Sequence, residues 1–156
     1  TTHYSEVNEN VMAYSLGGHR HLPEITQELG ALTEMQLNIT FLTHLIPMTR
    51  GILSSCYAPI NPSNSRSTEE IRDIYKEFYQ DSPFVQITDA PPQTKQTLGN
   101  NTCLIYPTID SRTNRLIVIS CIDNLVKGAA GMAVQNMNIM FGWPEDLALK
   151  ALAVYP

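Results

Sequence analysis

The fold of this chain is decided by the stretch CLIYPTIDSRTNRLIVISCI, residues 103–122. Two apolar runs, 103–109 and 116–122, flank a polar segment that contains Asn114. Runs rich in β-branched and aromatic residues favour strands, and an asparagine in the connection tolerates the positive φ of a tight turn. The stretch therefore predicts an antiparallel β-hairpin, to which further strands can be added.

The residues before this hairpin predict more strands and two helices. We expect strands at 11–16, 35–45, 52–60 and 84–88, with a loop at 61–65. A short helix should begin near Pro23 and end at Gly30. The pattern Ser67-Thr-Glu-Glu70 is typical of a capping box and predicts a helix with apolar residues at Ile71, Ile74, Tyr75 and Phe78.

The residues after the hairpin predict one closely packed helix over 127–141, ended by Gly142. Strands interrupted by a few helices, without regular βα alternation, indicate an α+β fold: a mostly antiparallel sheet with helices on one face. The 156 residues are enough for a single domain, which we expect to span 1–156.

Composition argues against several classes of protein. The formal net charge is -5 and the 10 Lys and Arg residues are scattered, which disfavours nucleic acid as a partner. The chain contains no apolar run of the roughly 20 residues that a membrane span needs. The cysteines, Cys56, Cys103 and Cys121, are odd in number and lie in apolar contexts, which predicts reduced core thiols in a cytosol-like compartment.

Four segments, in this order, resemble the N-acetyl-gamma-glutamyl-phosphate reductase family. They are GHRHLPEI (18–25), HLIPMTRGI (44–52), GNNTC (99–103) and ISCIDNLVKGAAG (119–131), the last continued by VQNMN (134–138). The resemblance implies a glyceraldehyde-3-phosphate-dehydrogenase-like C-terminal catalytic domain, whose sheet forms much of the subunit interface of a homo-oligomer. It also implies a role in arginine biosynthesis, in which the complete enzyme converts N-acetylglutamyl phosphate to N-acetylglutamate semialdehyde with NADPH, in the cytoplasm or in a plastid or mitochondrial matrix.

The chain departs from the family in two ways. The family's nucleophilic cysteine lies upstream of the His-Arg-His segment, whereas Cys56 follows the second block, at the wrong place for that role. No Gly-x-Gly-x-x-Gly opens a βαβ unit, so the chain cannot cradle a pyrophosphate by itself. The N-terminal residues TTHYSEVNEN are polar and are interpreted as a segment entered from an upstream dinucleotide-binding half. We expect the isolated chain to be inactive.

Within this resemblance, His19 and His21 are the candidate catalytic residues, because an imidazole can activate a thiol and transfer protons near neutral pH. Their spacing does not decide between them. Arg20 and Arg50 can supply forked donors to an anionic substrate, or can form surface salt bridges. Tyr14 is expected to line the same pocket, with a core tyrosine as the alternative.

The candidate cofactor-binding residues lie in the last block. Asn136 and Asn138 offer amides to the nicotinamide carboxamide and Gly131 permits close backbone approach, although a small-residue packing helix explains the same pattern. Asp123 and Lys127 are interpreted as a structural charge pair. A metal site using both histidines is disfavoured, because no Cys-x-x-Cys or His-Glu-x-x-His accompanies them.

Two other functions remain open at this point. The chain can be a stand-alone, non-catalytic dimerisation or ligand-binding module. It can also belong to a relative that acts on another acyl phosphate, as aspartate-semialdehyde dehydrogenase does.

Overall fold

The computed structural model describes residues 3–33, 35–61, 63 and 66–154. The chain divides into two compact units, Thr1–Thr49 and Arg50–Pro156, and each is described by itself. Residues 62, 64 and 65 of the expected loop at 61–65 lie outside the described part. No helix in the described part is both long and apolar enough to cross a membrane.

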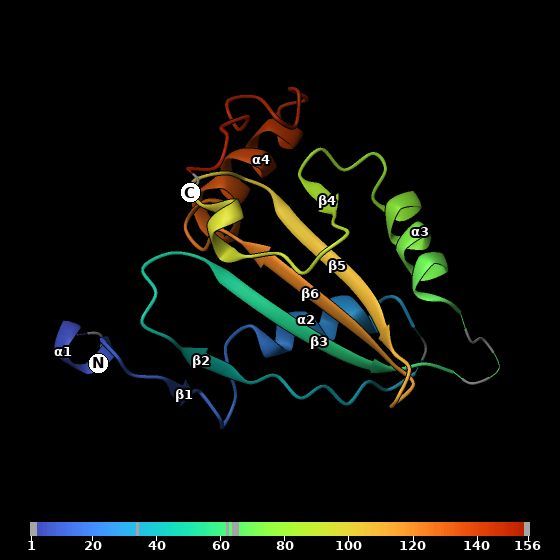
Figure 1. The fold of residues 1–156 in the computed structure, drawn as a ribbon. Helices are drawn as coiled ribbons and strands as arrows, with labels where there is room; N and C mark the ends of the chain where they lie inside the picture. Colours follow the sequence, from blue (N-terminus) through green and yellow to red (C-terminus); the bar gives the residue numbers. More distant parts are fainter. Residues whose placement is uncertain (1–2, 34, 62, 64–65, 155–156) are drawn as a thin grey trace. The chain divides into compact units, whose positions relative to one another are not determined.

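The first unit contains two short helices and a two-stranded antiparallel sheet. Its elements are α1 (Tyr4–Val7), β1 (Met12–Tyr14), α2 (Leu22–Gly30) and β2 (Thr43–Leu45). Strand β1 pairs with β2 so that Met12 lies opposite Leu45 (Figure 1). The helix expected between Pro23 and Gly30 is confirmed. The strand expected over 35–45 is wrong for 35–42, because β1 is only three residues long and offers no ladder partner beyond Thr43.

The second unit is built on a four-stranded sheet. Its strands are β3 (Ile52–Pro59), β4 (Val85–Ile87), β5 (Cys103–Asp110) and β6 (Arg115–Ile122), in the spatial order β3-β6-β5-β4 (Figure 1). The long strand β6 is antiparallel to both of its neighbours, β3 and β5, whereas β4 runs parallel to β5. The hairpin β5–β6 and the mostly antiparallel sheet are therefore confirmed, and Asn114 has the expected positive φ of 49°.

Strand β3 is an edge strand, and every one of its residues is exposed. Antiparallel partners share a face of the sheet, so Leu53 and Tyr57 lie on the same face as Cys121, whereas Cys56 lies on the other. Leu53 is 51% and Tyr57 63% exposed. The edge of the sheet thus presents apolar side chains with more than half of their surface exposed.

Helix α3 (Thr68–Phe78) begins with the capping box that the sequence predicts. The Glu70 amide donates to Ser67 Oγ at 3.1 Å, and the Ser67 amide donates to Glu70 Oε2 at 2.7 Å. Two N-terminal amides are thereby satisfied. The helix packs against β5, but Ile74 and Phe78 of its apolar stripe remain exposed.

The helix expected over 127–141 is divided into two parts. A π-helical turn, η3 (Val126–Ala130), leads into α4 (Gly131–Met140), and Gly142 closes α4 with a φ of 68°. The turn is wide because the Ala130 amide bonds to the Leu125 carbonyl, five residues back, at 2.9 Å. A 3-10 turn, η2 (Thr94–Thr97), lies between β4 and β5 in the chain.

All described residues of the buried class lie in the second unit. The buried apolar ones are Phe84, Leu104, Ile105, Cys121 and Leu149, and the polar ones are Thr97, Asn100, Asn101, Asp123, Gln135 and Asn138. The prediction of core thiols holds for Cys121 and is wrong for Cys56, because Cys56 stands on the exposed edge strand. Polar side chains therefore form a large share of this core.

Candidate functional site

The first unit gathers three rings around His19, which follows the turn at Gly18. The ring centroid of His19 lies 5.6 Å from that of Tyr14, 5.4 Å from Phe41 and 4.9 Å from His21, all in edge-to-face contacts. Such contacts restrict the rotation of a half-buried imidazole. The structure therefore brings together three residues that the sequence singled out: Tyr14, His19 and His21.

A backbone hydrogen bond orients the His19 ring further. The amide of His21 donates to His19 Nδ1 at 3.2 Å. When Nδ1 is an acceptor, a neutral imidazole carries its proton on Nε2. His21 is exposed and stands at the N-cap of α2. Of the two candidate histidines, His19 is the one whose ring is held on two sides.

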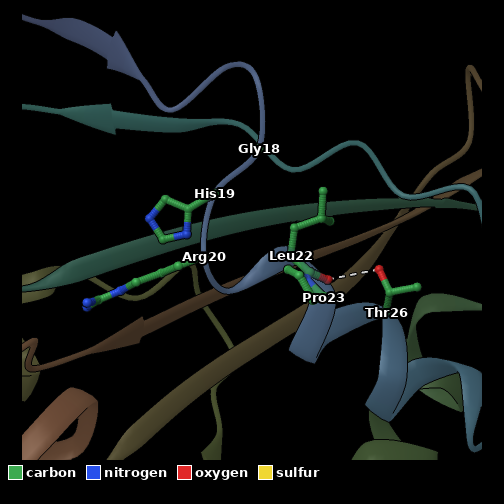
Figure 2. A pocket seen from close by; sticks show the side chains of 6 residues that line it. All are labelled: Gly18, His19, Arg20, Leu22, Pro23 and Thr26. Atoms are coloured by element: carbon green, nitrogen blue, oxygen red, sulfur yellow. Dashed lines mark hydrogen bonds between the residues drawn. The ribbon is translucent and has the colours of Figure 1, made fainter.

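A shallow hollow of about 490 Å³ lies beside this cluster (Figure 2). It is lined by Gly18, His19, Arg20, Leu22, Pro23 and Thr26. Figure 2 shows the side chains of His19 and Arg20 extending to the same side of the turn, and Thr26 Oγ1 donating to the Leu22 carbonyl at 2.9 Å. Arg20 is exposed. An imidazole and a guanidinium thus share one open, mostly apolar surface.

The second unit has its own centre, the carboxylate of Asp123, which has no exposed surface. Its Oδ2 accepts from Arg50 Nη2 at 2.5 Å and from the Gly99 amide at 2.7 Å. Its Oδ1 accepts from the amides of Leu125 at 2.8 Å and Val126 at 2.9 Å. One carboxylate therefore joins the start of β3, the turn at Gly99 and the start of η3.

Hydrogen bonds keep Asp123 ionised in spite of its burial. Burial alone raises the pKa of this carboxyl, but the bonds from Arg50 and from the amides of Gly99, Val126 and Leu125 together lower it to about 2. The expected charge pair between Asp123 and Lys127 is wrong. The Lys127 ammonium instead donates to Gln135 Oε1 at 2.8 Å, because the Asp123 oxygens are already occupied by Arg50 and backbone amides.

Arg50 is fixed at its backbone as well as at its side chain. The amide of Gly51 donates to Asn124 Oδ1 at 2.7 Å. Gly51 has a φ of 107°, a conformation that favours glycine. Two consecutive residues, Asp123 and Asn124, thus hold the two consecutive residues Arg50 and Gly51.

The residues suggested for cofactor binding lie on α4, in the second unit. Asn138 is 1% exposed and its amide donates to the carbonyls of Glu145 at 3.1 Å and Leu147 at 3.0 Å. Gly131 is buried, and a Cβ there would lie 2.2 Å from Asn101 Oδ1. Both residues therefore have packing roles inside the unit. Asn136 is exposed, so its amide is the one that faces outward.

No group of three or more His, Cys, Asp or Glu side chains in the described part could hold a metal ion. The predicted residues form two separate sets, with Tyr14, His19, Arg20 and His21 in the first unit and Arg50, Gly131, Asn136 and Asn138 in the second.

Comparison with known proteins identifies the family. Residues 1–124 match the family model described as semialdehyde dehydrogenase, dimerisation domain. The chain belongs to this family. The matched region includes the His19 cluster, Arg50 and Asp123.

Several curated relatives of this dimerisation domain carry the same name. The chain is 56% identical over 154 residues to an N-acetyl-gamma-glutamyl-phosphate reductase of Dehalococcoides mccartyi, which covers 98% of the chain and 45% of the relative. Relatives of the same name from Pelotomaculum thermopropionicum and Geobacter metallireducens are 50% and 51% identical, over 99% and 98% of the chain and 45% and 44% of the relative. The resemblance stated from the four sequence blocks is confirmed. The chain spans about 45% of the length of these relatives.

A solved structure confirms the fold class. The dimerisation domain aligns with aspartate semialdehyde dehydrogenase II of Vibrio cholerae at a TM-score of 0.62, over 87% of this chain and 42% of that one. The sequence identity is 17%, so this likeness concerns the fold alone. The α+β fold of the semialdehyde dehydrogenase type, expected from the sequence, is thereby established.

Sequence reasoning missed a second polar group of the dimerisation domain, centred on Gln135. Gln135 Oε1 accepts from Lys127 Nζ at 2.8 Å and from Asn101 Nδ2 at 2.9 Å, and Gln135 Nε2 donates to Glu145 Oε1 at 2.6 Å. Burial lowers the pKa of Lys127, and the charges of Cys103 and Glu145 oppose that shift. The available signal was the i, i+3 spacing of Gln135 and Asn138, which places two amides on one helix face.

Proposed function

We propose that this chain is the substrate-binding and dimerisation half of an N-acetyl-gamma-glutamyl-phosphate reductase, an oxidoreductase of arginine biosynthesis. The observation that carries the proposal is the convergence at Asp123. Three of the four sequence blocks that carry the resemblance contribute Arg50, Gly99 and Asp123 to one set of hydrogen bonds, across as many as 73 positions. Relatives with 44% to 56% identity that share this name support it.

In this proposal His19 is the proton-transfer residue. The His21 amide orients its ring through Nδ1, and the imidazole would exchange a proton with the substrate or with a thiol supplied by the dinucleotide-binding half once this hydrogen bond is released, so that one nitrogen can accept a proton while the other donates one. Arg20, on the same hollow, donates to oxygens of the anionic acyl phosphate, with Tyr14 supporting His19. Arg50, in the second unit, is proposed separately as a donor to such oxygens. His21 acts through its backbone.

The cofactor of the proposed enzyme is NADPH, which supplies the hydride. The residues present fit only its nicotinamide end: Asn136 is exposed on α4, whereas Gly131 and Asn138 have packing roles, and no glycine-rich βαβ turn occurs among the described residues. Asn136 would then bind the carboxamide. The partner polypeptide must provide the pyrophosphate site and the nucleophilic cysteine, in the cytoplasm or in a plastid or mitochondrial matrix.

Reconstitution tests this proposal. The chain is combined with the dinucleotide-binding half of the Dehalococcoides mccartyi relative, and phosphate-dependent reduction of NADP is followed with N-acetylglutamate semialdehyde. We expect activity with the mixture and none with either half. Activity on aspartate semialdehyde in its place would favour the other acyl-phosphate enzyme, and an inactive but well-formed complex would overturn the proposal.

The homo-oligomer is proposed to form through the exposed edge and face of the four-stranded sheet. Leu53 and Tyr57 lie on one face of β3 and are both exposed, as residues at an interface between copies would be in a single chain. Leu53→Arg should convert a dimer to a monomer in light scattering, whereas Phe78→Arg on α3, which is even more exposed, should not. The opposite pattern would place the interface on α3.

A non-catalytic dimerisation module is the second candidate function, favoured by the same exposed strand. It predicts a dimer that binds no dinucleotide-binding half. Failure of the two halves to associate, with an intact dimer of this chain, would select this candidate.

A further inference from the structure

Asp123 is buried and ionised, yet the proposed chemistry gives it no task. Among the described residues it is the only charged side chain of the buried class. A buried carboxylate is costly unless its oxygens are satisfied. Here both oxygens accept two hydrogen bonds each, from Arg50, Gly99, Leu125 and Val126. Of these donors, Arg50 alone is a side chain.

The Arg50 side chain is held only at one end of its guanidinium. Nη2 contacts Asp123 at 2.5 Å, Nε is buried without a hydrogen-bond partner among the described residues, and 31% of the side chain is exposed. A guanidinium has five N–H donors in a rigid plane. Fixing one Nη nitrogen therefore fixes the direction in which the outer donors point.

The same carboxylate fixes Arg50 relative to α4. Its Oδ1 caps the amides of Leu125 and Val126, at the start of the segment that continues into α4, and Asn124 holds the Gly51 amide. Arg50 is thereby placed relative to the helix that carries Asn136, within one unit.

We propose that Asp123 is a positioning residue that presents the guanidinium of Arg50 to the anionic group of the substrate. The inference rests on the proposed function, because it takes Arg50 to be a substrate ligand. The ligand chemistry is a carboxylate or phosphate oxygen, for which a fixed guanidinium gives forked donors. A long side chain that is already immobilised loses little further freedom when substrate binds, so the benefit appears in substrate affinity.

The test compares Asp123→Asn with the wild type in the reconstituted enzyme. Asparagine can still accept from the amides of Leu125 and Val126, but it places an NH₂ group or a neutral oxygen opposite Arg50. We expect the KM for N-acetylglutamate semialdehyde or for inorganic phosphate to rise about tenfold, the size of one charged hydrogen bond. The KM for NADP should stay unchanged. The substrate whose KM rises identifies the anionic group that Arg50 binds.

Two further variants keep the inference testable if Asp123→Asn fails to fold. Arg50→Lys should raise the same KM about as much, and Asn124→Ala, which removes the backbone anchor, should raise it about threefold. The matched control is Arg72→Lys with Asp89→Asn, an exposed pair at 3.4 Å whose arginine also has a buried Nε without a partner. It should leave both substrate KM values unchanged.

The outcomes separate the inference from the proposed function. An inactive wild-type reconstitution contradicts the proposed function. An active wild type combined with a folded Asp123→Asn variant of lower stability but unchanged substrate KM overturns the positioning role and leaves a structural ion pair. An unchanged KM in Arg50→Lys overturns it as well.

Discussion

The two units of the chain differ in what holds their side chains. Among the described residues of Thr1–Thr49 none is in the buried class, and His19 is held by ring contacts and one backbone hydrogen bond. In Arg50–Pro156 the corresponding centre, Asp123, is fully buried and has four donors. The first unit thus carries its candidate catalytic group on an open surface, and the second carries a closed polar core.

This difference predicts which substitutions mainly change stability and which mainly change activity. A change at the half-buried imidazole of His19 alters chemistry with little loss of stability, whereas a change in the buried hydrogen-bond network of Asp123 lowers stability first. We therefore expect substitutions at His19 to lower activity more than stability, and substitutions at Asp123 to lower stability strongly.

The largest effect on stability is expected for Asp123→Ala. The substitution leaves Arg50 and the amides of Gly99, Leu125 and Val126 without their acceptor. We expect a loss of about 3 kcal/mol in the free energy of unfolding, measured in urea. Asp89→Ala, at an exposed partner of Arg72, should change it by less than about 0.5 kcal/mol. Equal effects would remove the distinction between buried and exposed carboxylates.

Glycine substitutions give a smaller contrast between the units. An alanine at Gly131 would place Cβ 2.2 Å from Asn101 Oδ1 and 2.7 Å from the Val126 carbonyl, so Gly131→Ala should cost about 1–3 kcal/mol. At Gly30, in α2 of the first unit, nothing lies within 4 Å of a Cβ. Gly30→Ala should stabilise by up to about 1 kcal/mol, because it reduces the freedom of the unfolded chain. Thermal unfolding of both variants checks this, and a stable Gly131→Ala would contradict the tight packing of α4.

Acid sensitivity is the smallest of these effects and belongs to the second unit. The folded pKa of Asp123, about 2, lies below its ordinary value of 3.8, so its stabilising contribution is present above about pH 4 and disappears as the pH falls towards 2. The stability difference between wild type and Asp123→Asn should therefore shrink over this range in urea titrations. A difference that is constant with pH would show that the charge of Asp123 does not stabilise the fold.

The parts of the fold that depend on residues close together in the sequence were predictable. The hairpin around Asn114 and the capping box at Ser67 are local patterns with one physical solution. The strand over 35–42 was not, because an alternating pattern forms a strand only where a partner exists, and β1 ends after three residues. The close approach of Asn101 to Gly131, where the π turn meets α4, is likewise a distant contact that no local pattern reveals.

The same limit applies to the candidate site: its local parts were predictable, and its long-range pairs were not. The Gly18-His19-Arg20-His21 block stays together because it is continuous, and the structure adds that His19 is the oriented ring. The partner of Asp123 was mistaken, because spacing favours Lys127, four residues away, while the real partner Arg50 is 73 residues away. Distant polar pairs leave no periodic signal in one sequence.

The most direct test of His19 as the proton-transfer residue is the turnover of His19→Gln and His21→Gln in the reconstituted enzyme. Glutamine keeps a polar side chain but cannot exchange a proton near neutral pH. We predict that His19→Gln lowers kcat by about 100-fold or more, while His21→Gln, which retains the backbone amide that orients His19, stays within about threefold of wild type. A larger loss in His21→Gln, or full activity in His19→Gln, would contradict the account.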